Sequence, residues 1–177
     1  MTEFSAAPPI EPPLYPIGLR TTLVADPQRD GRLLGVDVWY PAASDDGSRS
    51  EYELFPGVSF LAAAAQHEPP PAAGRFPLIL FSHGRTGFRF AYSLLCEALA
   101  ARGAIVVSAD HPGDGLTDWL LGSFVDDRTN EINRVGDAHA VLAELGPGGT
   151  LLPAVLIDAI DHERVALAGH SYGAYTA

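Results

Sequence analysis

The sequence predicts an α/β fold, with a mostly parallel sheet, an antiparallel hairpin on its N-terminal side and helices on both faces. Three observations lead to this class. Short apolar stretches typical of fully buried strands begin at Phe76, Ala104 and Arg164. Segments with helical periodicity lie between them, and two β-rich stretches precede them. Because strands that alternate with helices need crossover connections, the three buried strands are expected to be parallel.

The N-terminal segment is expected to be an arm outside the domain. Residues 1–16 contain five prolines and little periodicity, which is typical of an extended segment. They have neither the basic start nor the apolar core of a secretory signal, and no stretch of the chain approaches the roughly 20 apolar residues of a membrane span. We therefore expect residues 17–177 to form the domain, with a cytoplasmic location and no membrane span.

The segment before Phe76 predicts a hairpin followed by a short helix. The β-rich stretches Leu19–Ala25 and Leu33–Tyr40 are separated by Asp-Pro and Asp-Gly, which is typical of an antiparallel pair. The alanine-rich stretch Ser59–Gln66 is predicted to be a short helix that ends before the triple proline at 69–71.

Two amphipathic segments between the buried strands predict helices whose apolar stripes pack on the sheet. Gly103 ends the first helix, and Gly146-Pro147 ends the second. Between them, the segment "GLTDWLLGSFVDD" is expected either to line a pocket or to pack on the helices. The stripe of the first helix is Ala91, Leu94, Leu95, Ala98 and Leu99, and that of the second is Ile132, Val135, Ala138, Leu142 and Leu145. The apolar residues of the segment between the helices are Trp119, Leu120, Leu121 and Phe124.

The composition is that of a globular protein that binds no nucleic acid. Of 177 residues, 47% are hydrophobic and 19% charged, and the net charge of −11 argues against a surface for phosphates. Cys96 is the single cysteine, which excludes an internal disulfide and a cysteine-based zinc site; in a helical pattern it is expected to pack as a small hydrophobe. No metal or cofactor is expected, because the histidines and carboxylates lack the spacing of a ligand set.

The segment Gly169-His170-Ser171-Tyr172-Gly173 fits the pattern G-x-S-x-G of a nucleophile elbow. A sharp turn from strand to helix strains the serine backbone, and the two flanking glycines leave room for the tight crossing. We expect the Ser171 hydroxyl to stand at the carboxyl edge of the sheet and the Tyr172 N–H to face developing negative charge. The alternative is an ordinary tight turn between a strand and a helix.

A second glycine-rich turn, Ser82-His83-Gly84-Arg85-Thr86-Gly87, follows the first buried strand. Such a turn can offer a second backbone N–H to an oxyanion. Arg85 is the expected donor, with its side chain free to touch substrate. Gly84 and His83 are expected to support the loop, His83 through a hydrogen bond. The alternative is a plain loop between a strand and a helix.

These motifs together resemble the α/β-hydrolase superfamily. The matching segments are "FSHG", "ALAARGAIVVSADHPGDG" and "VALAGHSYGAYTA", and they are most similar to dienelactone-hydrolase-like and platelet-activating-factor-acetylhydrolase-like members. The resemblance covers about residues 15–177 and implies a three-layer fold and ester hydrolysis through an acyl-serine. It implies Ser171 as the nucleophile and the N–H groups of Tyr172 and Arg85 as the oxyanion hole. Dienelactones, short acyl esters and oxidised or acetylated phospholipids remain open as substrates.

The catalytic acid and histidine of that superfamily have no counterpart here. They follow the serine in chain order, and no acidic residue or histidine follows Ser171. We therefore expect the sequence to be the N-terminal portion of a longer hydrolase, weakly active or inactive alone. His111 could replace the missing base only if it reaches Ser171. The side chain of His170 is expected to point away from the serine, and His67, His139 and His162 are expected to be surface or packing residues.

Two other functions stay open. The strand before Ser171 would become an apolar edge in a truncated chain, prone to self-association. A hydrolase remnant without activity could bind partners through that edge. Thioesterase or peptidase activity would use the same serine machinery as ester hydrolysis.

Overall fold

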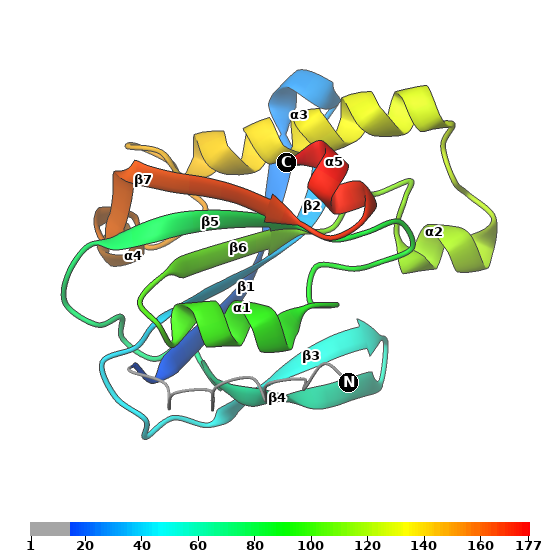
Figure 1. Cartoon of the computed structure of the whole chain (residues 1–177). Helices are drawn as coiled ribbons and strands as arrows, with labels where there is room; N and C mark the ends of the chain where they lie inside the picture. The colour runs from blue at the N-terminus through cyan, green and yellow to red at the C-terminus, as the bar shows by residue number, and fades with distance from the viewer. Residues whose placement is uncertain (1–14) are drawn as a thin grey trace, which may run out of the picture.

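The computed structural model describes residues 15–177 (Figure 1), so nearly all of the predicted arm lies outside the described residues. They form one seven-stranded sheet with the strand order β3-β4-β1-β2-β6-β5-β7, flanked by helices. The α/β fold predicted from the sequence is therefore confirmed, as a mixed sheet.

The predicted N-terminal hairpin is present. Strands β1 (Ile17–Asp26) and β2 (Arg32–Pro41) pair antiparallel along their whole length, with Ile17 opposite Pro41 and Asp26 opposite Arg32. The Asp26 carboxylate caps the connecting 3-10 turn (Pro27–Arg29) by accepting the Gln28 N–H. Strand β2 of this hairpin also pairs antiparallel with β6, so the hairpin extends the sheet beyond β6.

The three predicted parallel strands lie side by side on the other half of the sheet. Strand β5 (Phe76–Ser82) is in the middle and pairs in parallel with β6 (Ile105–Ala109) and β7 (Ile160–Gly169). Because the strands are parallel, their carboxyl ends meet at one edge of the sheet. Both glycine-rich turns leave the sheet at this edge, since Ser82 is the register partner of Gly169.

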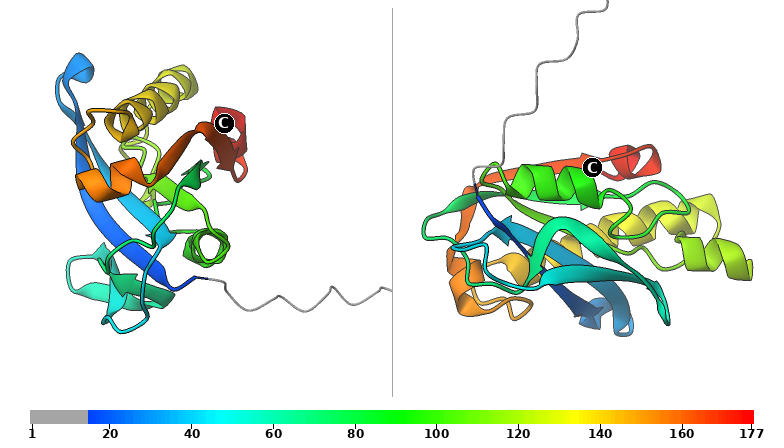
Figure 2. Two further views of the ribbon diagram at one scale, coloured as in Figure 1. Left: turned by 90° about the vertical axis from the view of Figure 1, so that its left-hand side faces the viewer. Right: turned by 90° about the horizontal axis from the view of Figure 1, so that it is seen from below.

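Alternating side chains of the strands build two hydrophobic cores, one on each face. On β6, Ile105 and Val107 join one core and Val106 joins the other. The first core packs under α3 (Asp127–Leu145) and α4 (Ala154–Asp158), and the second under α1 (Ser93–Ala100). Figure 2 shows α1 and α3 on opposite faces of the sheet. The short helices α2 (Leu116–Leu121) and α5 (Tyr172–Thr176) lie at the carboxyl ends of the strands.

The predicted helix at Ser59–Gln66 is wrong, because this segment lies in strand β4 (Val58–His67), paired with β3 (Arg49–Phe55). A single carboxylate explains the difference. Glu97 of α1 is buried, and its oxygens accept the backbone N–H groups of three consecutive alanines of β4 as well as the Tyr52 hydroxyl. A helix would use those N–H groups internally, so the tertiary contact overrides the local preference of alanine.

The two helices predicted between the strands are also turned relative to their predicted stripes. Helix α1 buries Cys96, Glu97 and Ala100 but leaves Leu94 71% exposed. Helix α3 leaves Ile132 63% exposed, and its buried residues are Asn130, Arg134, Asp137, Val141 and Leu145. The charged residues can face inward because each finds partners of opposite charge or hydrogen-bond donors there.

Two findings bear on the outer surface. Strand β7 ends the sheet, pairs only with β5 among residues 15–177, and exposes Val165 and Leu167. Self-association through this edge stays a prediction. No helix formed by residues 15–177 has the length and apolar character needed to cross a membrane.

Candidate active site

Ser171 stands in a strained turn between β7 and α5. Its backbone has φ 53° and ψ −120°, and residues other than glycine rarely adopt such a positive φ. The flanking glycines are needed for space, because a Cβ on Gly169 would collide with the backbone of Gly173, and a Cβ on Gly173 would collide with the carbonyl of Ser82. The turn therefore depends on glycine at both ends of the motif.

The second glycine-rich turn passes directly beside this serine. We call residues 82–87 the glycine loop. The His170 N–H donates to the Ser82 carbonyl at 3.2 Å, and a Cβ built on Gly84 would lie 3.4 Å from the Ser171 Cβ. Among residues 15–177, neither the Arg85 N–H nor the Tyr172 N–H donates a hydrogen bond to another residue. Two uncommitted backbone donors thus belong to residues next to this serine, since Tyr172 follows Ser171 in the chain and Arg85 follows Gly84. The Ser171 hydroxyl itself has no hydrogen-bond partner in this part of the chain.

The Arg85 side chain is engaged, contrary to the expectation that it is free for substrate. Its Nε donates to Asp114 at 2.9 Å and its Nη2 to Asp127 at 2.7 Å. Its guanidinium also lies 4.9 Å from the centre of the Tyr172 ring, within the range of a cation–π contact. The side chain therefore ties the glycine loop to the segment that follows Ser171.

A buried Ser–His–Asp chain lies next to this turn but does not include Ser171. His111 Nε2 is 2.9 Å from Ser82 Oγ, and His111 Nδ1 is 3.0 Å from Asp137 Oδ2. All three residues are buried, and burial lowers the pKa of His111, so the imidazole is held neutral. With both ring nitrogens committed to other partners, His111 makes no hydrogen bond to Ser171.

Burial opposes the charge of Asp137, yet hydrogen bonds from His111 and Arg32 hold the pKa of this carboxyl below its usual range. The ionised carboxylate fixes the tautomer by accepting from His111 Nδ1, so His111 Nε2 accepts from the Ser82 hydroxyl. Arg29 and Arg32 approach Asp137 from the β1–β2 turn and β2, each at 2.8 Å. This network anchors α3 to the hairpin.

His83 supports the glycine loop from inside. Its Nδ1 donates to the Gly84 carbonyl at 2.7 Å. The side chain is buried, and burial lowers its pKa to about 3, so it is neutral at ordinary pH. Its Nε2 is buried without a partner among the described residues.

Sequence reasoning missed Arg134, Asp114 and Asp137, the charged residues behind the turn. Arg134 and Asp137 are three residues apart, which places them on one face of a helix, and this spacing was the available signal. Their partners come from distant segments, such as Asp114 in the loop after β6. The apolar stripe of α3 pointed to a different face, so the pattern of the helix alone hid them.

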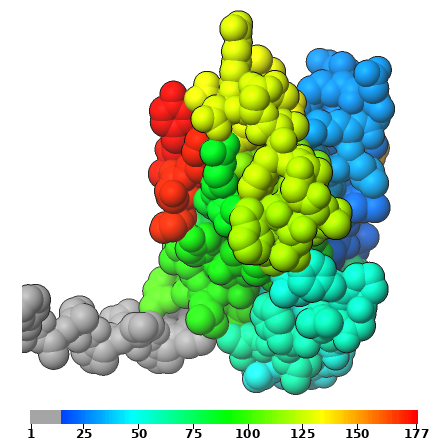
Figure 3. Space-filling model, turned by 90° about the vertical axis from the view of Figure 1, so that its right-hand side faces the viewer, coloured from blue at the N-terminus to red at the C-terminus, as the bar shows by residue number. Residues whose placement is uncertain are grey.

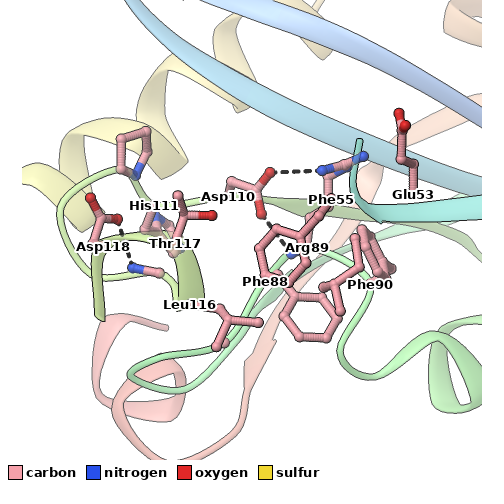
Figure 4. A pocket seen from close by; sticks show the side chains of 14 residues that line it. Glu53, Phe55, Phe88, Arg89, Phe90, Asp110, His111, Leu116, Thr117 and Asp118 are labelled. Atoms are coloured by element: carbon pink, nitrogen blue, oxygen red, sulfur yellow. Dashed lines mark hydrogen bonds and ion pairs between the residues drawn. The ribbon is translucent and has the colours of Figure 1, made fainter. Parts of the chain in front are cut away.

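A cavity of about 280 Å³ opens at the end of the glycine loop, between Gly87, the tip of β3 and the start of α2 (Figure 4). Phe55, Phe88, Phe90 and Leu116 supply its apolar wall. Figure 3 shows α5, the glycine loop, α2 and the β3–β4 hairpin together on this side of the molecule.

Arg89 forms the charged side of the cavity. Its Nη1 lies 2.9 Å from Asp110 Oδ2 and its Nε lies 3.1 Å from Asp37 Oδ1, so the guanidinium is already neutralised. Burial raises the pKa of Asp37. Leu116 and Thr117 of the predicted pocket segment line the cavity, but its apolar residues Trp119, Leu120, Leu121 and Phe124 do not and are exposed.

Two other kinds of site find no support in the geometry. Cys96 is fully buried, and burial raises the pKa of its thiol to about 12, which makes it inert. Within residues 15–177, no three or more His, Cys, Asp or Glu side chains are grouped so that they could hold a metal ion.

Comparison with known proteins gives partial matches in sequence. The family model for platelet-activating factor acetylhydrolase, isoform II, matches residues 57–118. A curated relative named "Putative phospholipase A2" from Schizosaccharomyces pombe is 43% identical over 42 residues, which are 24% of this chain and 10% of that protein.

Comparison of structures extends over nearly the whole chain. A ferulic acid esterase from Streptomyces cinnamoneus matches with a TM-score of 0.73 and 28% identity, over 97% of this chain and 56% of the esterase. A protein named "Putative Dienelactone Hydrolase" from Klebsiella pneumoniae matches with a TM-score of 0.50 and 12% identity, over 89% and 51% of the two chains. The chain thus spans about half the length of these structures. The resemblance to the α/β-hydrolase superfamily that the motifs predict is confirmed.

Proposed function

We propose that this member of the α/β-hydrolase superfamily is a serine-dependent ester hydrolase in which Ser171 is the nucleophile. The observation that carries the proposal is the strained turn at Ser171, with the uncommitted N–H groups of Arg85 and Tyr172 beside it. Strain of this kind persists where surrounding structure enforces it, and it concentrates at functional sites. The esterase and hydrolase matches support the same reaction class.

In the proposed reaction the Ser171 oxygen attacks the ester carbonyl carbon and gives up its proton to a base. The carbonyl oxygen becomes an oxyanion, which the N–H groups of Arg85 and Tyr172 stabilise as donors already in place. Collapse of this intermediate breaks the bond to the alcohol, which leaves with a proton. Water then attacks the acyl-serine, releases the acid and restores the hydroxyl.

The general base and the catalytic acid are proposed to lie outside residues 15–177. None of the histidines in this part of the chain hydrogen-bonds to Ser171, and His111 is committed to Ser82 and Asp137. The match to about half of the esterase structure is consistent with further catalytic residues elsewhere. Without a base the hydroxyl is a weak nucleophile, so the 177-residue chain is weakly active or inactive alone.

The substrate is proposed to be a neutral ester with an aromatic or apolar group that occupies the cavity beside Gly87. Its phenylalanine wall suits such a group. The carboxylates of Glu53, Asp110 and Asp118 also line the cavity, whereas its cation, Arg89, is already paired. A negatively charged group would therefore be disfavoured there.

Labelling with a fluorophosphonate tests this function, because phosphonylation needs the same hydroxyl and the same oxyanion donors. Slow labelling of the purified chain is expected to disappear in Ser171→Ala and to remain in Ser48→Ala, a control at an exposed serine. Equal labelling of wild type and Ser171→Ala would reject Ser171 as the nucleophile.

The alternative, a partner-binding remnant without activity, rests on the exposed apolar side chains of the β7 edge, Val165 and Leu167. It predicts a concentration-dependent assembly in sedimentation that Val165→Lys prevents, together with no labelling at Ser171. Labelling at Ser171 would decide for the hydrolase.

A further inference from the structure

The Gly84 carbonyl is the most heavily bonded group in the glycine loop. It accepts from His83 Nδ1 at 2.7 Å, from the Gly87 N–H at 3.1 Å and from Arg134 Nη2 at 3.4 Å. This carbonyl and the Arg85 N–H belong to one peptide unit. Because the unit is planar and trans, its N–H points opposite to its C=O. The groups that hold the Gly84 oxygen therefore also set the direction of the Arg85 N–H.

Arg134 is the one long-range element of this anchor. It lies on α3, is fully buried, and directs its Nη1 to the His83 carbonyl at 2.9 Å and to Ser82 Oγ at 3.1 Å. With its Nη2 contact to Gly84, one guanidinium binds three consecutive residues of the loop. A planar, rigid group of five N–H donors suits this task, which a lysine could not reproduce.

Asp114 holds that guanidinium in place. Its Oδ2 lies 2.9 Å from Arg134 Nε and 2.8 Å from Nη2, and both side chains are almost completely buried. Its other oxygen accepts from Arg85 Nε at 2.9 Å. A buried ion pair is a weak source of stability, because desolvation offsets much of the attraction. Its value here is that it fixes one geometry for the loop.

The same guanidinium reaches the second N–H donor. The Arg134 Cζ lies 5.2 Å from the centre of the Tyr172 ring, and the Arg85 Cζ lies 4.9 Å from it. The Tyr172 hydroxyl is buried without a hydrogen-bond partner among the described residues, so packing and cation–π contact orient this ring. Arg134 thus touches both the loop that carries one donor and the residue that carries the other.

We propose that Arg134, held by Asp114, is a positioning residue that sets the direction of the Arg85 N–H group in the loop beside Ser171. The catalytic meaning of this direction rests on the proposed function, but the direction itself can be measured without any reaction.

Residual dipolar couplings of the ¹⁵N-labelled chain test the proposal, because they report the orientation of each N–H bond. In Arg134→Lys the Arg85 coupling is expected to change beyond error while the couplings of β5 and β6 stay the same. Arg128→Lys is the matched control, since it makes the same change at an exposed position of the same helix. An unchanged Arg85 coupling in a folded Arg134→Lys would overturn the proposal.

If Arg134→Lys does not fold, the isosteric Asp114→Asn is compared in the same way. It removes the charge that holds the guanidinium and is expected to move the Arg85 coupling in the same direction. An Arg85 coupling equal to wild type in folded Asp114→Asn would overturn the proposal as well.

Fluorophosphonate labelling separates this proposal from the proposed function. Arg134→Lys is expected to slow labelling of Ser171 about 10-fold to 100-fold, near the lower end of what loss of one oxyanion donor costs. If wild-type Ser171 never reacts but the Arg85 N–H turns in the variant, the function fails and the positioning role stands. If Ser171 reacts equally fast in both and the coupling is unmoved, the positioning role fails and the function stands.

Discussion

Ser82 ends strand β5, and Ser171 follows the end of the neighbouring strand β7, so two serines stand at the same edge of the sheet. Ser82 is buried, and its hydroxyl belongs to a complete Ser–His–Asp chain of hydrogen bonds. Ser171 is exposed, has a strained backbone and makes no such bond within residues 15–177. A Ser–His–Asp chain therefore does not by itself identify a nucleophile, because a reacting hydroxyl also needs access and oxyanion donors.

The buried chain around Ser82 has a structural role. It joins the end of β5 to the loop after β6 and to α3, and Arg134 adds a fourth member by donating to Ser82 Oγ. The Ser171 hydroxyl takes no part in this buried network. Changes to the Ser–His–Asp chain of Ser82, His111 and Asp137 should alter stability, and changes at Ser171 should alter reactivity.

The largest expected effect on stability follows removal of Asp137. Asp137→Ala leaves Arg32 and His111 without their buried acceptor and should lower the free energy of unfolding by about 3–5 kcal/mol. Urea unfolding measures the loss. The control is Asp127→Ala, whose carboxylate is 76% exposed in its pair with Arg85 and should cost less than about 1 kcal/mol. Similar losses in both variants would contradict a structural role for the buried chain.

The stability of the buried region should depend on pH, because it contains histidines that burial keeps neutral. The pKa of His83 falls from 6.5 to about 3 on folding, so below pH 6.5 the unfolded chain takes up a proton that the native state refuses. The free energy of unfolding should therefore decrease as the pH is lowered, by about 2 kcal/mol between pH 7 and pH 5 for His83 alone. His111 acts in the same direction, because burial lowers its pKa too.

His83→Asn tests this contribution, since its amide can still donate a hydrogen bond. Urea unfolding at the two pH values should show about 2 kcal/mol less pH dependence in this variant than in wild type. His139→Gln, a change at an exposed histidine, should retain the full dependence. A pH dependence that is the same in wild type and His83→Asn would show that His83 is not held neutral by burial.

The smallest effect is expected from the hydroxyl that gives the buried chain its resemblance to a catalytic triad. Ser82→Ala leaves His111 Nε2 without a donor and should cost about 1.5 kcal/mol of stability. Labelling of Ser171 by a fluorophosphonate should continue in this variant. Loss of labelling with an unchanged fold would mean that Ser82, and not Ser171, reacts.

The sequence predicts those parts of the molecule that local patterns determine. Continuous apolar stretches identify the strands β5, β6 and β7, although the full burial predicted for β7 is wrong, because β7 is the exposed edge of the described sheet. The glycines at 169 and 173 identify the turn, because no other residue fits there. The segment at Ser59–Gln66 was predicted wrongly, because its structure depends on Glu97, a residue about thirty positions away that binds three of its N–H groups.

The buried charges behind the site could not be predicted for the same reason. Arg134 faces inward because it hydrogen-bonds there to Asp114 and to the carbonyls of the glycine loop, and these partners come from other segments of the chain. Judged by the apolar stripe of α3 alone, Arg134 belongs on the outside. The turn that carries Ser171, the proposed nucleophile, is therefore visible in the sequence, whereas the buried charges packed behind it are not.

The most direct test is to find where a fluorophosphonate attaches. The chain is incubated with the reagent, digested, and the modified peptide identified by mass spectrometry. We expect slow modification of Ser171 and none of Ser82, because oxyanion donors alone retain part of the catalytic effect when the base is absent. Modification at Ser82, or labelling that persists unchanged in Ser171→Ala, would contradict it.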